Sequence, residues 1–246
     1  MPTIPSSRSL VIPLRNEAGR IGATLAALSA SRLADGDLEL LLIDDGSTDG
    51  TVDAAEAAIT AAGNLRGKVV VQDVHRGKGA AVREGLLLAS GSARVFVDAD
   101  LPVACADVER CFATLEAGRA DVVYGCRTHA ASRVLRPQPR LRVVTGRLFN
   151  RWLRVLGLTG EHDTQCGLKG VTAEAATVVV EPLTVDDFAF DVELLARARR
   201  AGLRTVAVPV DWTHVEASHV LSLCDGLAAA RSAWRIRSRL RRERMC

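Results

Sequence analysis

Arg94-Val95-Phe96-Val97-Asp98-Ala99-Asp100 is the stretch that decides the fold of this chain. Its apolar run of strand-forming residues ends in two carboxylates that are separated by one residue. In an extended segment, residues i and i+2 point to the same side. Asp98 and Asp100 therefore present hard oxygen ligands to one point beyond the strand, as suits Mg²⁺ or Mn²⁺ that also holds a diphosphate. The alternative is an ordinary Asp-rich turn, but the neighbouring segments favour the metal site.

Strand-like and helix-like segments alternate through the first half of the chain. The pattern predicts strands at 9–14, 38–43, 68–74, 94–97 and 121–124, with helices between them at 18–30, 50–61, 80–89 and 107–118. Nearly continuous apolar strands that alternate with helices predict an α/β fold with a mostly parallel sheet and helices on both faces. No linker is visible, so we expect one domain over 1–246.

The second half is less regular. Apolar residues at helical spacing from Leu141 to Val155 predict a helix over 141–156 with arginines on its other faces. A helix at 187–201, a strand at 205–212 and an increasingly basic helix at 219–243 are also predicted.

Composition excludes several classes of protein. With 48% hydrophobic residues in 246, the chain can bury a real core and wholesale disorder is excluded. No apolar run approaches the roughly 18–20 residues that cross a bilayer, and the N-terminus lacks a signal-peptide pattern. The six cysteines form no CxxC pair, so we expect thiols of a cytoplasmic protein and neither a disulfide frame nor a zinc site.

The net charge of +3 conceals an asymmetry between the two halves. Residues 1–126 carry 12 basic and 17 acidic side chains, a balance of −5, whereas residues 127–246 carry 20 and 12, a balance of +8. Residues 127–160 contain eight arginines and no acid, and residues 231–244 contain seven arginines and only Glu243. Such segments suit phosphate-bearing partners.

Three acidic segments each follow a predicted strand: Asn16-Glu17, Asp44-Asp45 and Asp98/Asp100. The carboxyl ends of parallel strands form one rim, where ligands of such sheets bind. The segment 44–51 also suits a helix N-cap, but its two adjacent carboxylates repel each other unless something binds them. The glycine-containing segment 75–80 leads into a helix and favours anions, although it lacks the P-loop spacing.

Together these motifs resemble the inverting GT-A glycosyltransferases of family 2. The resemblance covers roughly residues 9–237, and within the family it is to the dolichyl-phosphate β-glucosyltransferases and polyprenyl-phosphate sugar synthases. The motifs that carry it, in chain order, are Val11-Ile12-Pro13-Leu14-Arg15-Asn16-Glu17, Asp44-Asp45-Gly46-Ser47-Thr48-Asp49-Gly50, Arg76-Gly77-Lys78-Gly79, Asp98-Ala99-Asp100, Gly125-Cys126-Arg127, Asp163-Thr164-Gln165-Cys166-Gly167-Leu168-Lys169, Phe188-Ala189-Phe190-Asp191-Val192-Glu193-Leu194-Leu195 and Val210-Asp211-Trp212-Thr213. The membrane-spanning segments of some relatives have no counterpart here, which leaves the mode of membrane attachment open.

The resemblance implies a nucleotide-sugar-binding half at 9–126, an acceptor half at 127–218 and a basic C-terminal helix at 219–246. It implies UDP-glucose as donor, polyprenyl phosphate as acceptor, and Mg²⁺ or Mn²⁺ on Asp98 and Asp100. By the same resemblance, the donor site comprises Pro13, Leu14, Arg15, Glu17, Asp45, Lys78, Asp98, Ala99, Asp100 and Gln165, and the catalytic residues are Asp163, Arg127, Lys169 and Asp191.

The charge pattern bears on how the acceptor is activated. An alcohol must lose a proton to a nearby base, whereas a phosphate monoester, with a second pKa of about 6, is already largely dianionic at neutral pH. The acid-free arginine stretch favours the phosphate, with Arg127, Arg133 and Lys169 as candidate clamps. If a base exists, Asp163 is the first candidate and Asp191 the second, although Asp191 also fits a helix N-terminus.

The two basic helices suggest a peripheral position on an anionic, cytosolic membrane surface. For 141–156, an apolar stripe facing the core explains the pattern equally well. Nucleic acid is not expected, because few aromatic residues accompany the arginines. Three rival functions stay open: a GDP-mannose-dependent transferase, a transferase with a soluble acceptor, and a nucleotide-sugar-binding scaffold without activity.

Overall fold

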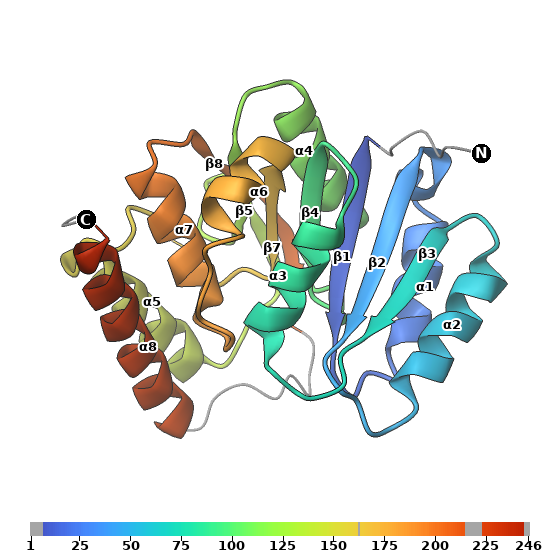
Figure 1. Cartoon of the computed structure of the whole chain (residues 1–246), viewed down its shortest axis with the longest axis horizontal. Helices are drawn as coiled ribbons and strands as arrows, with labels where there is room; N and C mark the ends of the chain where they lie inside the picture. Colours follow the sequence, from blue (N-terminus) through green and yellow to red (C-terminus); the bar gives the residue numbers. More distant parts are fainter. Residues whose placement is uncertain (1–6, 162, 215–222, 244–246) are drawn as a thin grey trace.

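The structure is a computed structural model that describes residues 7–161, 163–214 and 223–243. Its centre is a seven-stranded sheet in the order β3-β2-β1-β4-β7-β5-β8 (Figure 1). Its strands in chain order are β1 (Arg8–Leu14), β2 (Leu38–Asp44), β3 (Arg66–Val71), β4 (Ala93–Val97), β5 (Val122–Cys126), β7 (Leu168–Thr172) and β8 (Thr205–Pro209). The pairs are parallel except for those that β7 makes with β4 and β5.

Helices cover both faces of this sheet, as predicted. One face carries α1 (Ile21–Ser29), the 3-10 helix η1 (Arg32–Asp35), α2 (Thr51–Ala62) and α4 (Cys105–Glu116), and the other carries α3 (Lys78–Leu88), α6 (Ala173–Val179) and α7 (Phe190–Arg200). Successive residues of β1 alternate between the two cores: Leu10 and Ile12 face one and Val11 the other. Each such buried side chain contributes about 1.5–3 kcal/mol to folding.

The predictions for the second half were wrong in two places. β7 and α6 were not predicted, because the five residues of β7 include Lys169 and Gly170, which are untypical of a buried strand. The strand predicted at 205–212 is two strands. β8 ends at Pro209, which has no N–H to extend the ladder, and β9 (Asp211–Thr213) pairs with β6 (Arg133–Arg136) in a separate two-stranded sheet.

A third layer lies outside α7. The predicted helices at 141–156 and 219–243 correspond to α5 (Arg140–Val155) and α8 (Leu223–Arg242), which lie together at one end of the molecule (Figure 1). A small core of Leu153, Leu158, Val192, Ala196, Ala233 and Ile236 joins them to α7. Positions 1–6, 219–222 and 244–246 of the predicted segments lie outside the described residues. Within the described part of the chain, no helix combines the length and the apolar character that crossing a bilayer requires.

Candidate active site

The structure brings the predicted rim together at the carboxyl ends of β1 to β4. The strand order reverses between β1 and β4, which is where open α/β sheets bind their ligands. A cavity of about 500 Å³ opens at this point. It is lined by the predicted residues Pro13, Leu14, Arg15, Glu17, Asp45, Lys78, Asp98, Ala99 and Asp100, and also by Asn16, Arg20, His75, Arg76, Gly77, Ala81, Asp187 and Phe188. Gln165 is exposed and does not line this cavity.

Asp45 holds the loop that follows β3. Its buried carboxylate accepts hydrogen bonds from the backbone N–H groups of Arg76 at 2.7 Å and Gly77 at 3.0 Å, and His75 Nδ1 lies 2.7 Å away. The neighbouring Asp44 accepts from Ser47 N at 2.9 Å. Backbone N–H groups therefore bind both carboxylates, which offsets the repulsion expected between them.

The loops that follow β1 and β2 are also fastened to each other. The guanidinium of Arg15 donates to the carbonyls of Asp45, at 2.6 Å, and Gly46. Asn16 adopts the left-handed conformation with φ 53° and accepts from Thr48 N at 2.9 Å. These bonds hold together the loops that line this cavity.

Asp98 and Asp100 line the same cavity. Lys78 Nζ, at the start of α3, lies 2.5 Å from Asp98 Oδ1. Gly167 allows the Asp98 carboxylate its position, because a Cβ on this glycine would lie only 1.9 Å from Asp98 Oδ2. The backbone joins the two segments as well, with Asp98 N donating to Gly167 O at 3.0 Å. The DxD pair is thus positioned by the Gly167 segment as well as by its own strand.

The pair fits a divalent cation. Burial, together with the charges of Asp98 and Glu17, raises the pKa of Asp100 from 3.8 to about 6. A bound cation would relieve this crowding of carboxylates, and two carboxylates are suitable hard ligands for Mg²⁺ or Mn²⁺. Within the described residues, no three His, Cys, Asp or Glu side chains converge as a complete metal site. Further oxygens, such as those of a diphosphate, would have to come from a ligand.

Arg127 and Asp163 form a fixed pair on the acceptor side. The Arg127 guanidinium donates to both carboxylate oxygens of Asp163, at 2.8 and 2.7 Å, and its backbone N–H donates at 2.9 Å. Burial raises the pKa of Asp163, but the bonds from Arg127 outweigh it and the pKa lies below its ordinary value. The guanidinium also lies 5.4 Å from the ring centre of Trp212. Asp163 is therefore a poor proton acceptor as it stands.

Lys169 and Asp191 form a second pair beneath the site. Lys169 is completely buried, and its Nζ lies 2.8 Å from both Asp191 Oδ1 and the Cys166 carbonyl. Burial raises the pKa of Asp191, and the Lys169 charge opposes the rise. In this structure Lys169 and Asp191 contact each other and line neither the donor cavity nor a groove, and their direct catalytic roles stay predictions.

The sequence analysis did not assign to the site the segment just before α7, which also lines the cavity. Asp187 and Phe188 line the cavity, and Lys78 Nζ lies 5.7 Å from the ring centre of Phe188. The Asp186 carbonyl accepts from Gly79 N at 2.8 Å and leaves no room for a Cβ at Gly77, whose φ is +115°. The glycines of 76–79 were the available signal for this contact. They indicate that other atoms approach the backbone closely, but we had interpreted those atoms as the ligand and not as another part of the chain.

The fold and this site define a GT-A glycosyltransferase, with a donor cavity at the switch point of the sheet and a DxD pair on its wall. The chain belongs to glycosyl transferase family 2, whose model matches residues 9–181. It is therefore an enzyme, and the scaffold without activity is set aside.

Individual relatives agree with this assignment. The chain is 30% identical to the dolichyl-phosphate beta-glucosyltransferase of Dictyostelium discoideum over 241 residues, which cover 94% of this chain and 74% of the relative. It is also 30% identical to the enzyme of that name from Homo sapiens over 246 residues, with 94% and 75% covered. A crystal structure of glucosyl-3-phosphoglycerate synthase from Mycobacterium tuberculosis, in complex with Mn²⁺, UDP-glucose and phosphoglyceric acid, is similar in fold. Its TM-score is 0.69 at 23% identity, and the match covers 94% of this chain and 78% of that one.

Proposed function

We propose that this enzyme transfers glucose from UDP-glucose to a polyprenyl phosphate of the dolichyl type, with inversion at the sugar. The relatives at 30% identity carry that acceptor in their names. The observation that supports it in this chain is the state of Asp163, which is bound on both oxygens by Arg127 and is a poor base. An alcohol acceptor requires a base, whereas a phosphate dianion does not.

The donor would occupy the 500 Å³ cavity, with its base and ribose near Arg15 and Asp45 and its diphosphate near Lys78. Burial lowers the pKa of Lys78, but Asp98 and Asp191 outweigh it, so the ammonium stays charged where leaving-group charge develops. A divalent cation on Asp98 and Asp100 would supply Lewis-acid stabilisation of the same diphosphate.

The acceptor would enter along a second groove of about 600 Å³, whose lining includes Thr128, the residue that follows Arg127 in the chain. It is lined by Thr128, Val144, Arg147, Leu148, Asn150, Arg151 and Arg154. Asn150 accepts hydrogen bonds from Thr164 N and Oγ1, at 3.3 and 2.7 Å, which joins α5 to the loop of Asp163. Apolar side chains beside arginines suit a lipid whose phosphate is its only charged part. Arg133 pairs with Asp211 and is the weaker candidate clamp.

The same face supports a peripheral position on an anionic membrane at the cytosolic side. Val144, Leu148 and Val155 on α5 and Trp234 on α8 are exposed apolar side chains among arginines. For α5, the structure contains both features that the sequence left as alternatives: Leu153 faces the core, while Val155 is 78% exposed. Apolar anchors with basic neighbours are typical of interfacial helices.

The test is a transfer assay with radiolabelled UDP-glucose and Mn²⁺, followed by extraction of the lipid product. We expect label on polyprenyl phosphate and none on the matching polyprenol. Transfer to the polyprenol or to a soluble acceptor would contradict the proposal, and GDP-mannose in a parallel arm tests the rival donor. Arg151→Gln should raise the acceptor KM at least about tenfold with little change in donor KM, because one charge-assisted contact contributes about 1.5–3 kcal/mol. Arg119→Gln, an exposed arginine on the loop after α4, is the matched control.

A further inference from the structure

A further cavity lies where the C-terminal ends of α5, α7 and α8 meet. Its volume is about 370 Å³. Four arginines contribute to its lining, Arg199 and Arg200 from α7 and Arg237 and Arg241 from α8. Leu156, Leu158 and Leu240 supply apolar lining, and no residue is shared with the donor cavity or the acceptor groove.

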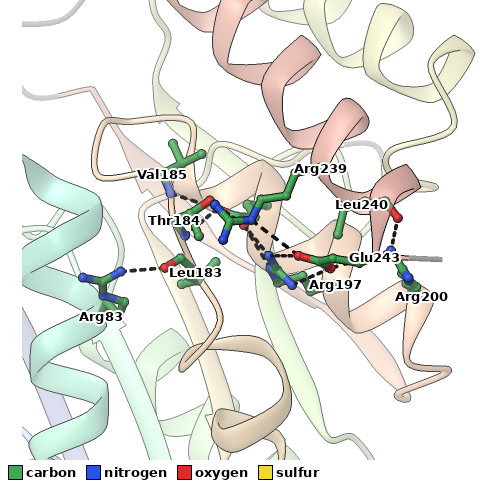
Figure 2. Close-up of polar contacts among 10 residues, drawn as sticks. Arg83, Leu183, Thr184, Val185, Arg197, Arg200, Arg239, Leu240 and Glu243 are labelled. Atoms are coloured by element: carbon green, nitrogen blue, oxygen red, sulfur yellow. Dashed lines mark hydrogen bonds and ion pairs between the residues drawn. The ribbon is translucent and has the colours of Figure 1, made fainter. Parts of the chain in front are cut away.

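Glu243, a carboxylate close to this cavity, already forms ion pairs with arginines. Figure 2 shows Glu243 between Arg197 and Arg239, with distances of 3.2 and 3.5 Å, and its other oxygen lies 3.7 Å from Arg200. In the part of the chain that the structure describes, no ion pair to a carboxylate is recorded for Arg199, Arg237 or Arg241. Within the described residues, an anion that enters the cavity therefore meets guanidinium donors that no carboxylate already engages.

Helix ends alone do not account for all four arginines. Cations near helix C-termini are stabilised by the helix dipole, and Arg200 does serve this purpose by donating to the Leu240 carbonyl (Figure 2). No such hydrogen bond is recorded for Arg199, Arg237 or Arg241 within the described residues. Arg237 instead lies over the Trp234 ring, 6.0 Å from its centre.

The walls of the cavity are fixed by the core beneath them. Arg197 is buried and donates to Glu193 at 2.8 and 3.0 Å. Glu193 in turn accepts from Thr184 and Val185 backbone N–H groups at 3.0 and 2.9 Å. The contacts that fix α7 against its neighbours, including the ion pair from Arg197 to Glu243, therefore do not involve Arg199, Arg237 or Arg241. The backbone that carries the cavity arginines is thus held in place, while the side chains of Arg199 and Arg241 are exposed.

We propose that this cavity binds a phosphate group whose substituent is partly apolar. Planar guanidinium forks match phosphate oxygens in pairs, and several arginines offer more donors than a carboxylate can accept. The leucines beside them suit the glycerol and first methylenes of a phospholipid, or the carbon skeleton of a soluble phosphate ester. This site goes beyond the proposed function, because it lies outside both substrate grooves.

The experiment compares two double variants of the full chain. Arg199→Gln/Arg241→Gln removes two cavity arginines, and Arg231→Gln/Arg235→Gln removes two exposed arginines of α8 that do not line the cavity. Vesicles of phosphatidylcholine with and without phosphatidylglycerol test the lipid source by co-sedimentation. Glycerol 3-phosphate tests the soluble source by thermal shift. Transfer activity in detergent reports that each variant is folded.

The proposal expects the cavity variant to lose at least tenfold more affinity than the control variant for the vesicles, for glycerol 3-phosphate or for both. The arm that shows the difference identifies the source of the phosphate. Diffuse attraction to a charged surface, at about 1 kcal/mol per basic residue, would weaken both variants equally. Equal losses on vesicles, with no cavity-dependent shift by glycerol 3-phosphate, would overturn the proposal. Arg237→Gln repeats the comparison with a single change if the double variant does not fold.

Discussion

Gly167→Ala should disable the enzyme without changing any charged residue. Gly167 does not have a positive φ, so alanine fits its backbone and the perturbation is purely steric. The new Cβ would lie 1.9 Å from Asp98 Oδ2, whereas ordinary contact begins near 3.4 Å, so the carboxylate must move by about 1.5 Å. The side chain of Asp98 is 27% exposed and can rotate away. The fold therefore survives while the cation ligand is displaced.

The size of the effect follows from that displacement. A misplacement of about 1 Å at a reacting centre costs roughly a hundredfold in rate. This corresponds to about 2.7 kcal/mol of lost transition-state stabilisation. Because the change acts on the cation ligand, the affinity for Mn²⁺ should fall together with kcat.

The assay is UDP release with saturating Mn²⁺, with calorimetric titration of Mn²⁺ and a thermal melt of each variant. Gly22→Ala is the matched control, because its Cβ would meet nothing within 4 Å and the residue lies inside α1. This control should keep full activity and melt at the same temperature or slightly higher. Full activity and unchanged Mn²⁺ affinity in Gly167→Ala would refute the role given to Asp98.

Two further predictions concern buried charge. Lys169→Met leaves Asp191 buried and unpaired, and should lower the free energy of unfolding by about 3–5 kcal/mol in urea titrations. The double change Lys169→Met/Asp191→Leu should recover most of that loss, and a double variant as unstable as the single one would contradict this account. Asp100→Asn should abolish Mn²⁺ binding, yet raise the melting temperature of chelator-treated protein at neutral pH. The reason is that the pKa of Asp100 is raised from 3.8 to about 6, so its ionisation costs stability as pH rises through that window. The difference should vanish below pH 3.8, and a lower melting temperature for the variant at neutral pH would count against it.

The sequence predicted which strand ends lie beside one cavity, because the signals for them are local. Each short apolar strand ends in polar residues, and the parallel topology then places those ends on one rim. Asp98 and Lys78 could be assigned to one cavity without knowledge of any side-chain contact. The exact strand limits mattered little, since most of the cavity lining lies at the ends of strands and in the loops that follow them.

The acceptor side was harder because its determinants are long-range. Nothing in the local sequence shows that Lys169 lies inside a strand against Phe96, 5.7 Å from its ring centre, or that Asp163 is bound by Arg127. A lysine in a polar-looking segment is ordinarily exposed. The prediction therefore counted Lys169 among the cations available to an acceptor. In the structure, Lys169 forms an ion pair with Asp191 instead.

The ion pair between Lys169 and Asp191 limits which positively charged side chains remain available to bind the phosphate of an acceptor. Three carboxylates of the site, Asp98, Asp163 and Asp191, are each paired with one cation, so these pairs add no net positive charge. A nucleotide-sugar donor that enters with a divalent cation has the negative charge of its diphosphate balanced by that cation. A dianionic acceptor has no such companion, and burying it beside neutral pairs would be unfavourable. Its charge must therefore be met from the groove of α5, where Arg147 and Arg151 lie beside apolar side chains. If the proposed function is right, the arginine-rich, acid-free stretch supplies the positive charge that a phosphate acceptor needs in order to bind.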